Sequence, residues 1–202
     1  LVTDVAISVA GAIRYTTEIS LGGDHITRDV AQILNCSMGD AETAKKRYGC
    51  ALPQMVERGR TIDLPSAGDS HELATHEEYL LAEVIEARLE DIFSIIREKI
   101  ERAGFGDHLH GGVVLTGGTS LLQGITDVAE RLLETKCRRG QPRNLKGLAT
   151  VVGSPIYATG IGLILYGAEG EEMEGNPRFT GAMGGSMGGM RRLFHYFLEN
   201  FI

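Results

Sequence analysis

A short apolar run that leads into paired glycines constrains the fold of this chain more than any other feature. Residues 113–115, Val-Val-Leu, are typical of a buried central strand, and Gly117-Gly118 follow after a single threonine. The next residues, Thr119-Ser120, are predicted to cap a helix that begins near Leu121, with the glutamine at 123 completing a capping box. The chain is therefore expected to turn sharply from a strand into a helix at the two glycines.

A strand, a glycine turn and a helix in this order suit a nucleotide site. Glycines have no side chain, so the backbone can approach a ligand closely. The helix N-terminus would present free N–H groups and the positive end of its dipole. The stretch lacks the Gly-Lys-Ser/Thr of a P-loop and the three spaced glycines of a dinucleotide fingerprint. A tight strand-to-helix turn in an ordinary α/β protein would give the same pattern, so both interpretations stay open.

The net charge and the cysteines exclude several classes of protein. The formal net charge is −7 and the sequence has no long basic block, so nucleic acid is not an expected partner. The three cysteines are widely spaced and form no Cys-x-x-Cys or zinc pattern, so we expect neither a disulfide framework nor a metal site. No apolar run is long enough to span a bilayer.

The first segments predict a hairpin followed by a helix. Residues 3–9 and 12–20 have the pattern of strands around an Ala10-Gly11 turn. Because the chain starts within a strand, we expect that an N-terminal half is missing. Asp24 is expected to cap a helix whose buried face carries Ile26, Val30, Ile33 and Leu34.

The next segment predicts a short helix. Asp40 is expected to cap a helix over residues 41–48, and Gly49 is expected to end it in the left-handed conformation.

A long helix is predicted in the middle of the chain. A strand over residues 60–64 and a polar loop precede it, and Thr75 with Glu78 is expected to form its capping box. The helix should run to about Ala103, and its apolar residues form one stripe: Leu81, Ile85, Leu89, Ile92, Ile96 and Ile100.

The C-terminal part predicts a strand, a helix, a linker and a second helix. A strand is expected at residues 135–139 and a helix at 156–166, opened by Ser154-Pro155. Residues 168–189 are polar and then glycine-rich, which predicts a flexible linker. Residues 190–202 are expected to form an amphipathic helix, whose apolar face carries Met190, Leu193, Phe194, Phe197, Leu198, Phe201 and Ile202. This helix suits the surface of a membrane, and docking onto the protein's own core is the alternative.

These features together resemble the actin/Hsp70 superfamily and, within it, the FtsA family of bacterial cell-division proteins. The stretch 113–120 is similar to the superfamily's adenosine loop, 41–49 to the short helix over the nucleoside, and 154–163 to the second inter-domain connector. A glycine linker that ends in an amphipathic helix is similar to the membrane-targeting tail of FtsA. The resemblance covers essentially the whole chain.

The resemblance implies an α/β fold, namely an actin-like ATPase domain with a sheet of the ribonuclease H type. Of that domain the chain would hold only subdomains 2A and 2B, plus the C-terminal amphipathic helix. Residues 1–35 and 111–167 would form subdomain 2A, and residues 36–110 would form subdomain 2B. Residues 168–189 would be the linker and residues 190–202 the membrane-targeting helix.

The resemblance also implies the adenosine half of an ATP site. Gly117, Gly118 and Thr119 would contact ribose and adenine through their backbone, and Glu42 and Lys45 would hydrogen-bond the nucleoside. Without the resemblance, Glu42 and Lys45 are a surface ion pair at i,i+3. The residues that hold the phosphates and magnesium would lie in the absent half. ATP with magnesium is therefore the expected cofactor of the full-length protein, with a weak ATPase activity at most.

A partner site is implied in subdomain 2B, which in FtsA receives the C-terminal peptide of the tubulin-like FtsZ. The helix start at 81–88 resembles the lining of that groove, so Ile85, Glu86 and Arg88 are the expected contact residues. Arg88 would pair with an acidic peptide. The alternative is a solvated Arg88 that pairs with a neighbouring glutamate.

The implied function is that of an adaptor which anchors FtsZ filaments to the inner face of the cytoplasmic membrane at the division septum. In its full-length form it would polymerise with itself and help to recruit later division proteins. The alternatives are a pilus-assembly protein of the PilM type and a chaperone-type ATPase or sugar kinase. A chaperone would need a β-rich substrate domain after residue 167, and a kinase would need a catalytic aspartate that the sequence does not reveal.

Overall fold

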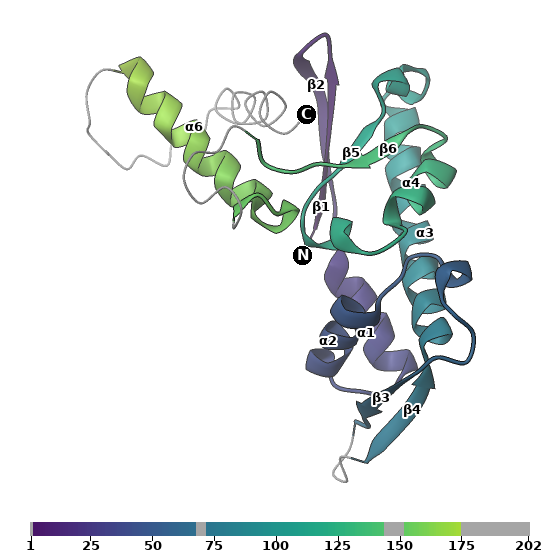
Figure 1. Cartoon of the computed structure of the whole chain (residues 1–202). Helices are drawn as coiled ribbons and strands as arrows, with labels where there is room; N and C mark the ends of the chain where they lie inside the picture. The colour runs from purple at the N-terminus through teal and green to yellow at the C-terminus, as the bar shows by residue number, and fades with distance from the viewer. Residues whose placement is uncertain (1, 68–71, 144–151, 175–202) are drawn as a thin grey trace. The chain divides into compact units, whose positions relative to one another are not determined.

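The computed structural model describes residues 2–67, 72–143 and 152–174 (Figure 1). The chain divides into two compact units. The first consists of Leu1–Val5, Thr17–Leu115 and Thr119–Arg138, and the second consists of Ala6–Thr16, Thr116–Gly118 and the residues from Arg139 onward.

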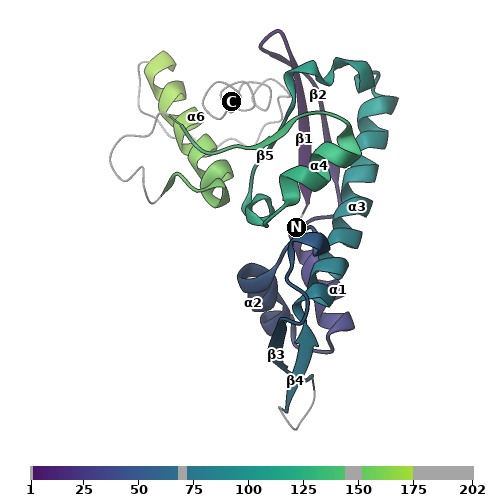
Figure 2. The ribbon, with the colours of Figure 1, turned by 45° about the vertical axis from the view of Figure 1, so that its right-hand side comes forward.

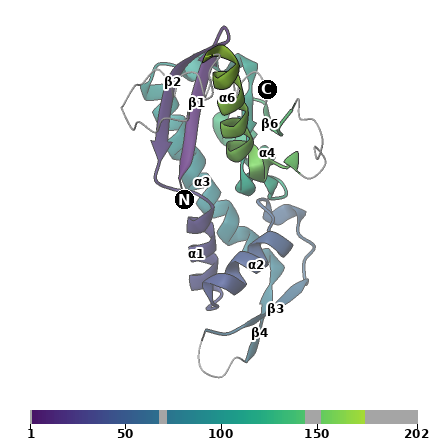
Figure 3. The same cartoon turned by 90° about the vertical axis from the view of Figure 1, so that its left-hand side faces the viewer.

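The chain opens with the predicted hairpin. Strand β1 (Thr3–Val9) pairs with β2 (Ala12–Ile19) in a two-stranded sheet (Figure 3). Ala10 has φ 52° and Gly11 has φ 76°. Two consecutive left-handed residues are what a two-residue hairpin turn of the I′ type requires, because its twist matches that of the strands. The prediction of a turn at these two residues is confirmed.

Three helices build the core of the first unit. Helix α1 (Gly23–Ile33) packs against α2 (Met38–Tyr48) and against the long helix α3 (Glu78–Arg102). The predicted apolar stripe of α3 is confirmed, since all six of its residues are buried. Ile26 and Val30 of α1 and Leu34 directly after it are buried as predicted, but Ile33 is 54% exposed. Ile33 lies in the last turn, on the side of α1 that lines a groove with α3.

The ends of α1 and α2 differ from the predictions. The residue before α1 is Gly22, so Asp24 lies within the first turn and does not occupy the cap position. The side chain of Ser37, one residue before α2, accepts a hydrogen bond from the Asp40 N–H, so Ser37 takes the cap position that was predicted for Asp40. Gly49 ends α2 with φ −67° and ψ 126°, which is extended backbone and not the left-handed conformation.

A second hairpin precedes α3. Strand β3 (Thr61–Pro65) pairs antiparallel with β4 (Leu73–Glu77), a segment that was predicted in part as loop. Thr75 lies opposite Asp63 and its hydroxyl donates to the Asp63 carboxylate over 2.7 Å. The predicted capping box of Thr75 and Glu78 is therefore wrong, because Thr75 belongs to the strand and helix α3 begins only at Glu78.

The glycine turn leads into a helix later than predicted. Strand β5 (Val113–Leu115) pairs with β6 (Cys137–Arg139), which shortens the strand predicted at 135–139. A 3-10 helix, η3 (Gly118–Leu121), follows β5, and helix α4 (Ile125–Leu133) begins only after Gly124. Gly124 has φ 76°, so it interrupts the helix that was predicted to start near Leu121, and Gly124 occupies the cap position of α4 in place of the predicted Thr119 or Ser120.

Helix α4 packs against α3 (Figure 2). Among the described residues the strands pair two by two, in the sheets β1–β2, β3–β4 and β5–β6. Two short 3-10 helices complete this part, η1 (Pro53–Met55) and η2 (Gly106–Gly111).

The second unit contains the helix that was predicted at residues 156–166. A 3-10 turn, η4 (Pro155–Tyr157), opens α6 (Ala158–Glu174), which continues into the first residues of the predicted linker. The rest of that linker and the amphipathic segment 190–202 lie outside the described residues. None of the helices described for this chain has the length and apolar character needed to cross a bilayer.

Candidate nucleotide and partner sites

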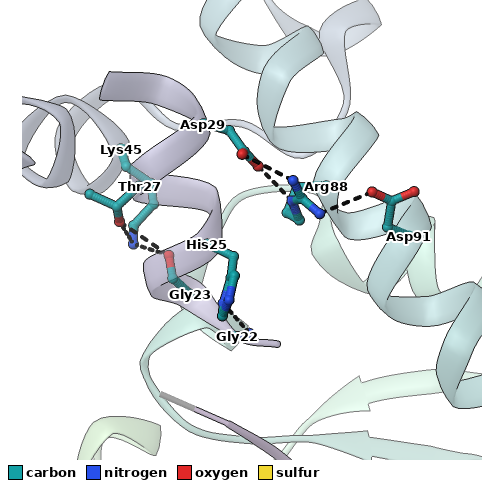
Figure 4. A network of polar contacts seen from close by, with 8 residues as sticks. All are labelled: Gly22, Gly23, His25, Thr27, Asp29, Lys45, Arg88 and Asp91. Atoms are coloured by element: carbon teal, nitrogen blue, oxygen red, sulfur yellow. Dashed lines mark hydrogen bonds and ion pairs between the residues drawn. The ribbon is translucent and has the colours of Figure 1, made fainter. Parts of the chain in front are cut away.

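Helices α1 and α2 bring a lysine, a glutamate and a threonine together. The Lys45 ammonium donates to the Gly23 carbonyl oxygen over 3.0 Å and to the Thr27 hydroxyl over 2.7 Å (Figure 4). It also pairs with Oε2 of Glu42 at 2.6 Å, and the Thr27 hydroxyl donates to the same oxygen at 2.5 Å. An ammonium has three N–H groups, so these three partners satisfy it fully.

Burial separates the roles of the two charged residues. The Lys45 side chain is only 9% exposed, and a buried ammonium is stable only when it is paired. The Glu42 side chain is 33% exposed and reaches the surface, where Lys46 also pairs with it at 3.1 Å. Burial would raise the pKa of Glu42, but hydrogen bonds from Lys45, Thr27 and Lys46 overcome that effect and lower the pKa to about 2.

Thr119 joins this cluster through the start of α1. A Cβ atom placed on Gly23 would lie 2.5 Å from the Thr119 hydroxyl oxygen and 3.7 Å from the Lys45 nitrogen. The structure therefore brings together Thr119, Glu42 and Lys45, three of the five predicted nucleoside residues. Gly23 and Thr27 complete the cluster and were missed by the sequence analysis. The only signal for Thr27 is its position four residues after Gly23, on the buried side of α1.

The other two predicted nucleoside residues lie in the second unit. Gly117 has φ 87°, which favours glycine, and its N–H donates to the Pro155 carbonyl oxygen over 3.2 Å. Apart from their chain neighbours, none of the described residues has an atom within 4 Å of the position that a Cβ would take on Gly117 or Gly118. Among the described residues no side chain therefore fills the space beside these two glycines, and their contact with a nucleoside stays a prediction. No group of three His, Cys, Asp or Glu residues that could hold a metal occurs among the residues that the structure describes.

A groove of about 330 Å³ lies between α1 and α3. Its apolar lining comes from Ile33, Val84 and Ala87, and its polar lining includes Arg88 and Asp29. The Arg88 guanidinium donates from Nε and Nη2 to both oxygens of Asp29, over 2.5 and 3.0 Å (Figure 4). Arg88 thus lines a groove, where it is paired with Asp29 of α1 and with Asp91 of its own helix, and its contact with a partner stays a prediction.

The two other predicted partner residues do not line this groove. Ile85 is fully buried and belongs to the core, so its predicted role at a surface groove does not agree with the structure. Glu86 pairs with Arg131 of α4 at 3.0 Å, and Arg131 also pairs with Glu90 at 2.8 Å. Glu86 therefore joins α3 to α4 in this structure.

Comparison with solved structures shows the fold. The chain matches the crystal structure of MreB5 of Spiroplasma citri bound to ADP with a TM-score of 0.64 and 16% sequence identity, over 87% of this chain and 53% of that chain. The AMPPNP-bound structure of the same protein matches with a TM-score of 0.62 and 19% identity. The described chain is therefore part of a mixed α/β, actin-like fold of the MreB kind.

Comparison with known sequences shows the family. The relative from Pseudomonas aeruginosa, named cell division protein FtsA, is 42% identical over 169 residues, which are 83% of this chain and 40% of that protein. The protein of that name from Escherichia coli strain K12 is 34% identical over 191 residues, or 90% of this chain and 45% of that protein. The chain thus spans less than half the length of these relatives. Because the family model described as "Cell division protein FtsA" matches residues 2–162, the resemblance seen in the sequence is confirmed, and the chain belongs to the FtsA family.

Proposed function

We propose that this chain is the part of an FtsA-type adaptor that binds the C-terminal peptide of FtsZ and ties FtsZ filaments to the inner face of the cytoplasmic membrane at the septum. Membership of the family of cell division proteins supports this role. For the full-length protein we propose binding of ATP with magnesium, self-polymerisation and recruitment of later division proteins. Any ATP hydrolysis would be weak, so the protein acts as a structural adaptor.

The groove between α1 and α3 is the observation that carries this proposal. Ile33 is a large apolar side chain that remains 54% exposed, and it lies beside Val84 and Ala87. A guanidinium stands among these apolar groups. A short peptide helix with one apolar side and a carboxylate would bury its apolar side in the groove and place the carboxylate on Arg88.

The nucleotide site rests on the Thr119 cluster and the glycines before it. We assign the backbone of Gly117, Gly118 and Thr119 to ribose and adenine, and the partly exposed Glu42 carboxylate to a direct bond with the nucleoside. Lys45 is buried and fully hydrogen-bonded, so its role is to hold Glu42 in place. The two MreB5 structures have ADP and AMPPNP bound, and the proposal extends this ligand class to the FtsA-type chain.

A peptide-binding experiment tests the partner site. The affinity of a fluorescent FtsZ C-terminal peptide would be measured by anisotropy for the full chain and for Arg88→Glu. Reversing this charge at the groove should weaken binding at least about tenfold, since charge-assisted bonds are among the strongest at a peptide site.

A matched control uses a second arginine on the same helix. Arg102 also lies on α3, but its side chain is 76% exposed and it pairs with Glu98, away from the groove. Arg102→Glu makes the same change in net charge, so it should leave the affinity unchanged within about twofold. Equal losses in the two variants would mean that net charge alone governs binding, and the groove would then not be the site.

A further inference from the structure

The guanidinium of Arg88 is shared by two carboxylates that hold it very differently. Asp29, on α1, takes two hydrogen bonds, from Nε and Nη2 (Figure 4). Asp91, one turn further along α3, takes a single bond from Nη1 over 3.1 Å. The Asp29 side chain is 25% exposed and the Asp91 side chain is 62% exposed.

This difference in geometry means that the two pairs differ in strength. A two-point contact fixes the plane of the guanidinium, and partial burial protects it from water and salt. The hydrogen bonding of Arg88 to Asp29 is also the main reason why the pKa of Arg88 is raised. A single bond to an exposed carboxylate at i,i+3 on one helix is weak and easily exchanged for water.

The remaining donors of Arg88 indicate where a third carboxylate would bind. A guanidinium has five N–H groups, and the contacts to Asp29 and Asp91 use three of them among the described residues. The other two are on the terminal nitrogens, Nη1 and Nη2, so a partner's carboxylate would approach the edge at which Asp91 is bound.

We propose that Asp29 is a positioning residue that holds Arg88 ready for an acidic peptide, and that Asp91 competes with the peptide for the same guanidinium. This inference rests on the proposed binding of an acidic, partly apolar peptide in the α1–α3 groove. It assigns opposite effects to two aspartates that contact one arginine. Removing the charge of Asp91 should strengthen peptide binding, and removing the charge of Asp29 should weaken it.

The test measures the affinity of the full chain for two synthetic peptides, the FtsZ C-terminal peptide and a copy with its side-chain carboxylates replaced by amides. Asp91→Asn should bind the acidic peptide about twofold to fivefold more tightly and the amide peptide as before, because a weakly held competing charge is removed. Asp29→Asn should bind the acidic peptide about tenfold more weakly, because Arg88 loses its fixed orientation. Asp29→Glu should restore part of that loss.

The possible outcomes separate the inference from the function on which it rests. If Asp29→Asn tightens binding as Asp91→Asn does, both aspartates act only as repelling charges and the inference is overturned. It is also overturned if Asp91→Asn leaves the affinity for the acidic peptide unchanged, or if either variant changes the affinity for both peptides alike. If the unaltered chain does not bind the acidic peptide, or if Arg88→Ala binds it equally well, the proposed function fails and the inference fails with it.

Discussion

The backbone of Gly49 approaches that of Lys45 so closely that no side chain fits at position 49. The Gly49 N–H donates to the Lys45 carbonyl oxygen over 3.0 Å, and a Cβ on Gly49 would lie 2.1 Å from that oxygen. It would also lie 3.0 Å from Leu122 and 3.1 Å from Ile85. Glycine is required here by lack of space and not by its backbone conformation, since a φ of −67° is open to any residue.

Gly49→Ala should therefore lower the free energy of unfolding by about 1–3 kcal/mol, since the clash involves backbone that cannot rotate away. Urea denaturation followed by circular dichroism measures this change. Gly39→Ala is the matched control within α2, because its added Cβ would meet only Ser37, at 3.7 Å. Alanine is a better helix former than glycine, so the control should be neutral or stabilising by up to about 1 kcal/mol. Equal effects at the two positions would contradict the steric argument.

Gly23 and Thr119 should be energetically coupled. A methyl group on Gly23 would meet the Thr119 hydroxyl at 2.5 Å, so Gly23→Ala forces that side chain to move. In a double-mutant cycle with Thr119→Ala, the cost of Gly23→Ala should be smaller by about 1 kcal/mol, which is typical of residues in contact. The measurement is the free energy of unfolding of all four proteins. If the effects of the two substitutions on the free energy of unfolding are strictly additive, the Thr119 side chain does not restrict the space at position 23, and the predicted coupling is wrong.

The Glu42 carboxylate should stabilise the protein in a pH-dependent way. Its pKa is about 2 in the folded protein against an ordinary value of 4.5. A carboxylate with a lowered pKa stabilises the fold above its unfolded value, and this stabilisation is lost as the pH falls through the folded value. Glu42→Gln should therefore cost about 1–3 kcal/mol at pH 7, because it leaves the buried Lys45 ammonium without its counter-ion. The difference from the unaltered chain should shrink as the pH falls from 4.5 toward 2. A difference that is independent of pH would mean that Glu42 acts through packing alone.

Much of the fold follows from local patterns in the sequence. The spacing of the α3 stripe and the Ala10-Gly11 turn each depend on a few neighbouring residues, and both predictions are confirmed. The predictions are wrong where contacts with residues distant in the sequence determine the local structure. Thr75 is a plausible helix cap by its spacing, but its register opposite Asp63 makes it part of a strand. Gly49 ends α2 in extended backbone, and glycine is needed there because Lys45, Leu122 and Ile85 leave no room for a Cβ.

The same distinction applies to the candidate sites. Glu42 and Lys45 are three residues apart on one helix, so their pairing is visible in the sequence. Thr27 meets them from α1, and Asp29 meets Arg88 across 59 residues. The pairing of Arg88 with Asp29 could not be foreseen, because no periodicity connects α1 to α3. The place of Arg88 at the edge of the buried face of α3 is predictable, since it lies beside the apolar stripe, whereas its role in binding stays a prediction.

The amphipathic segment 190–202, which lies outside the described residues, should bind membranes through its aromatic face. Burying a large apolar side chain gives roughly 1.5–3 kcal/mol, so partial insertion of several such residues supports reversible binding. The full chain should therefore sediment with liposomes, and the double substitution Phe194→Glu and Phe197→Glu should remain in the supernatant. A double substitution on the polar face, His195→Glu and Asn200→Glu, adds two glutamates but leaves the apolar face intact, so it should retain most of the binding to neutral lipid. If both variants lose binding equally, charge and not apolar burial drives the association. If the unaltered chain itself stays in the supernatant, the segment docks onto the protein, and the pilus-type alternative gains support over the membrane adaptor.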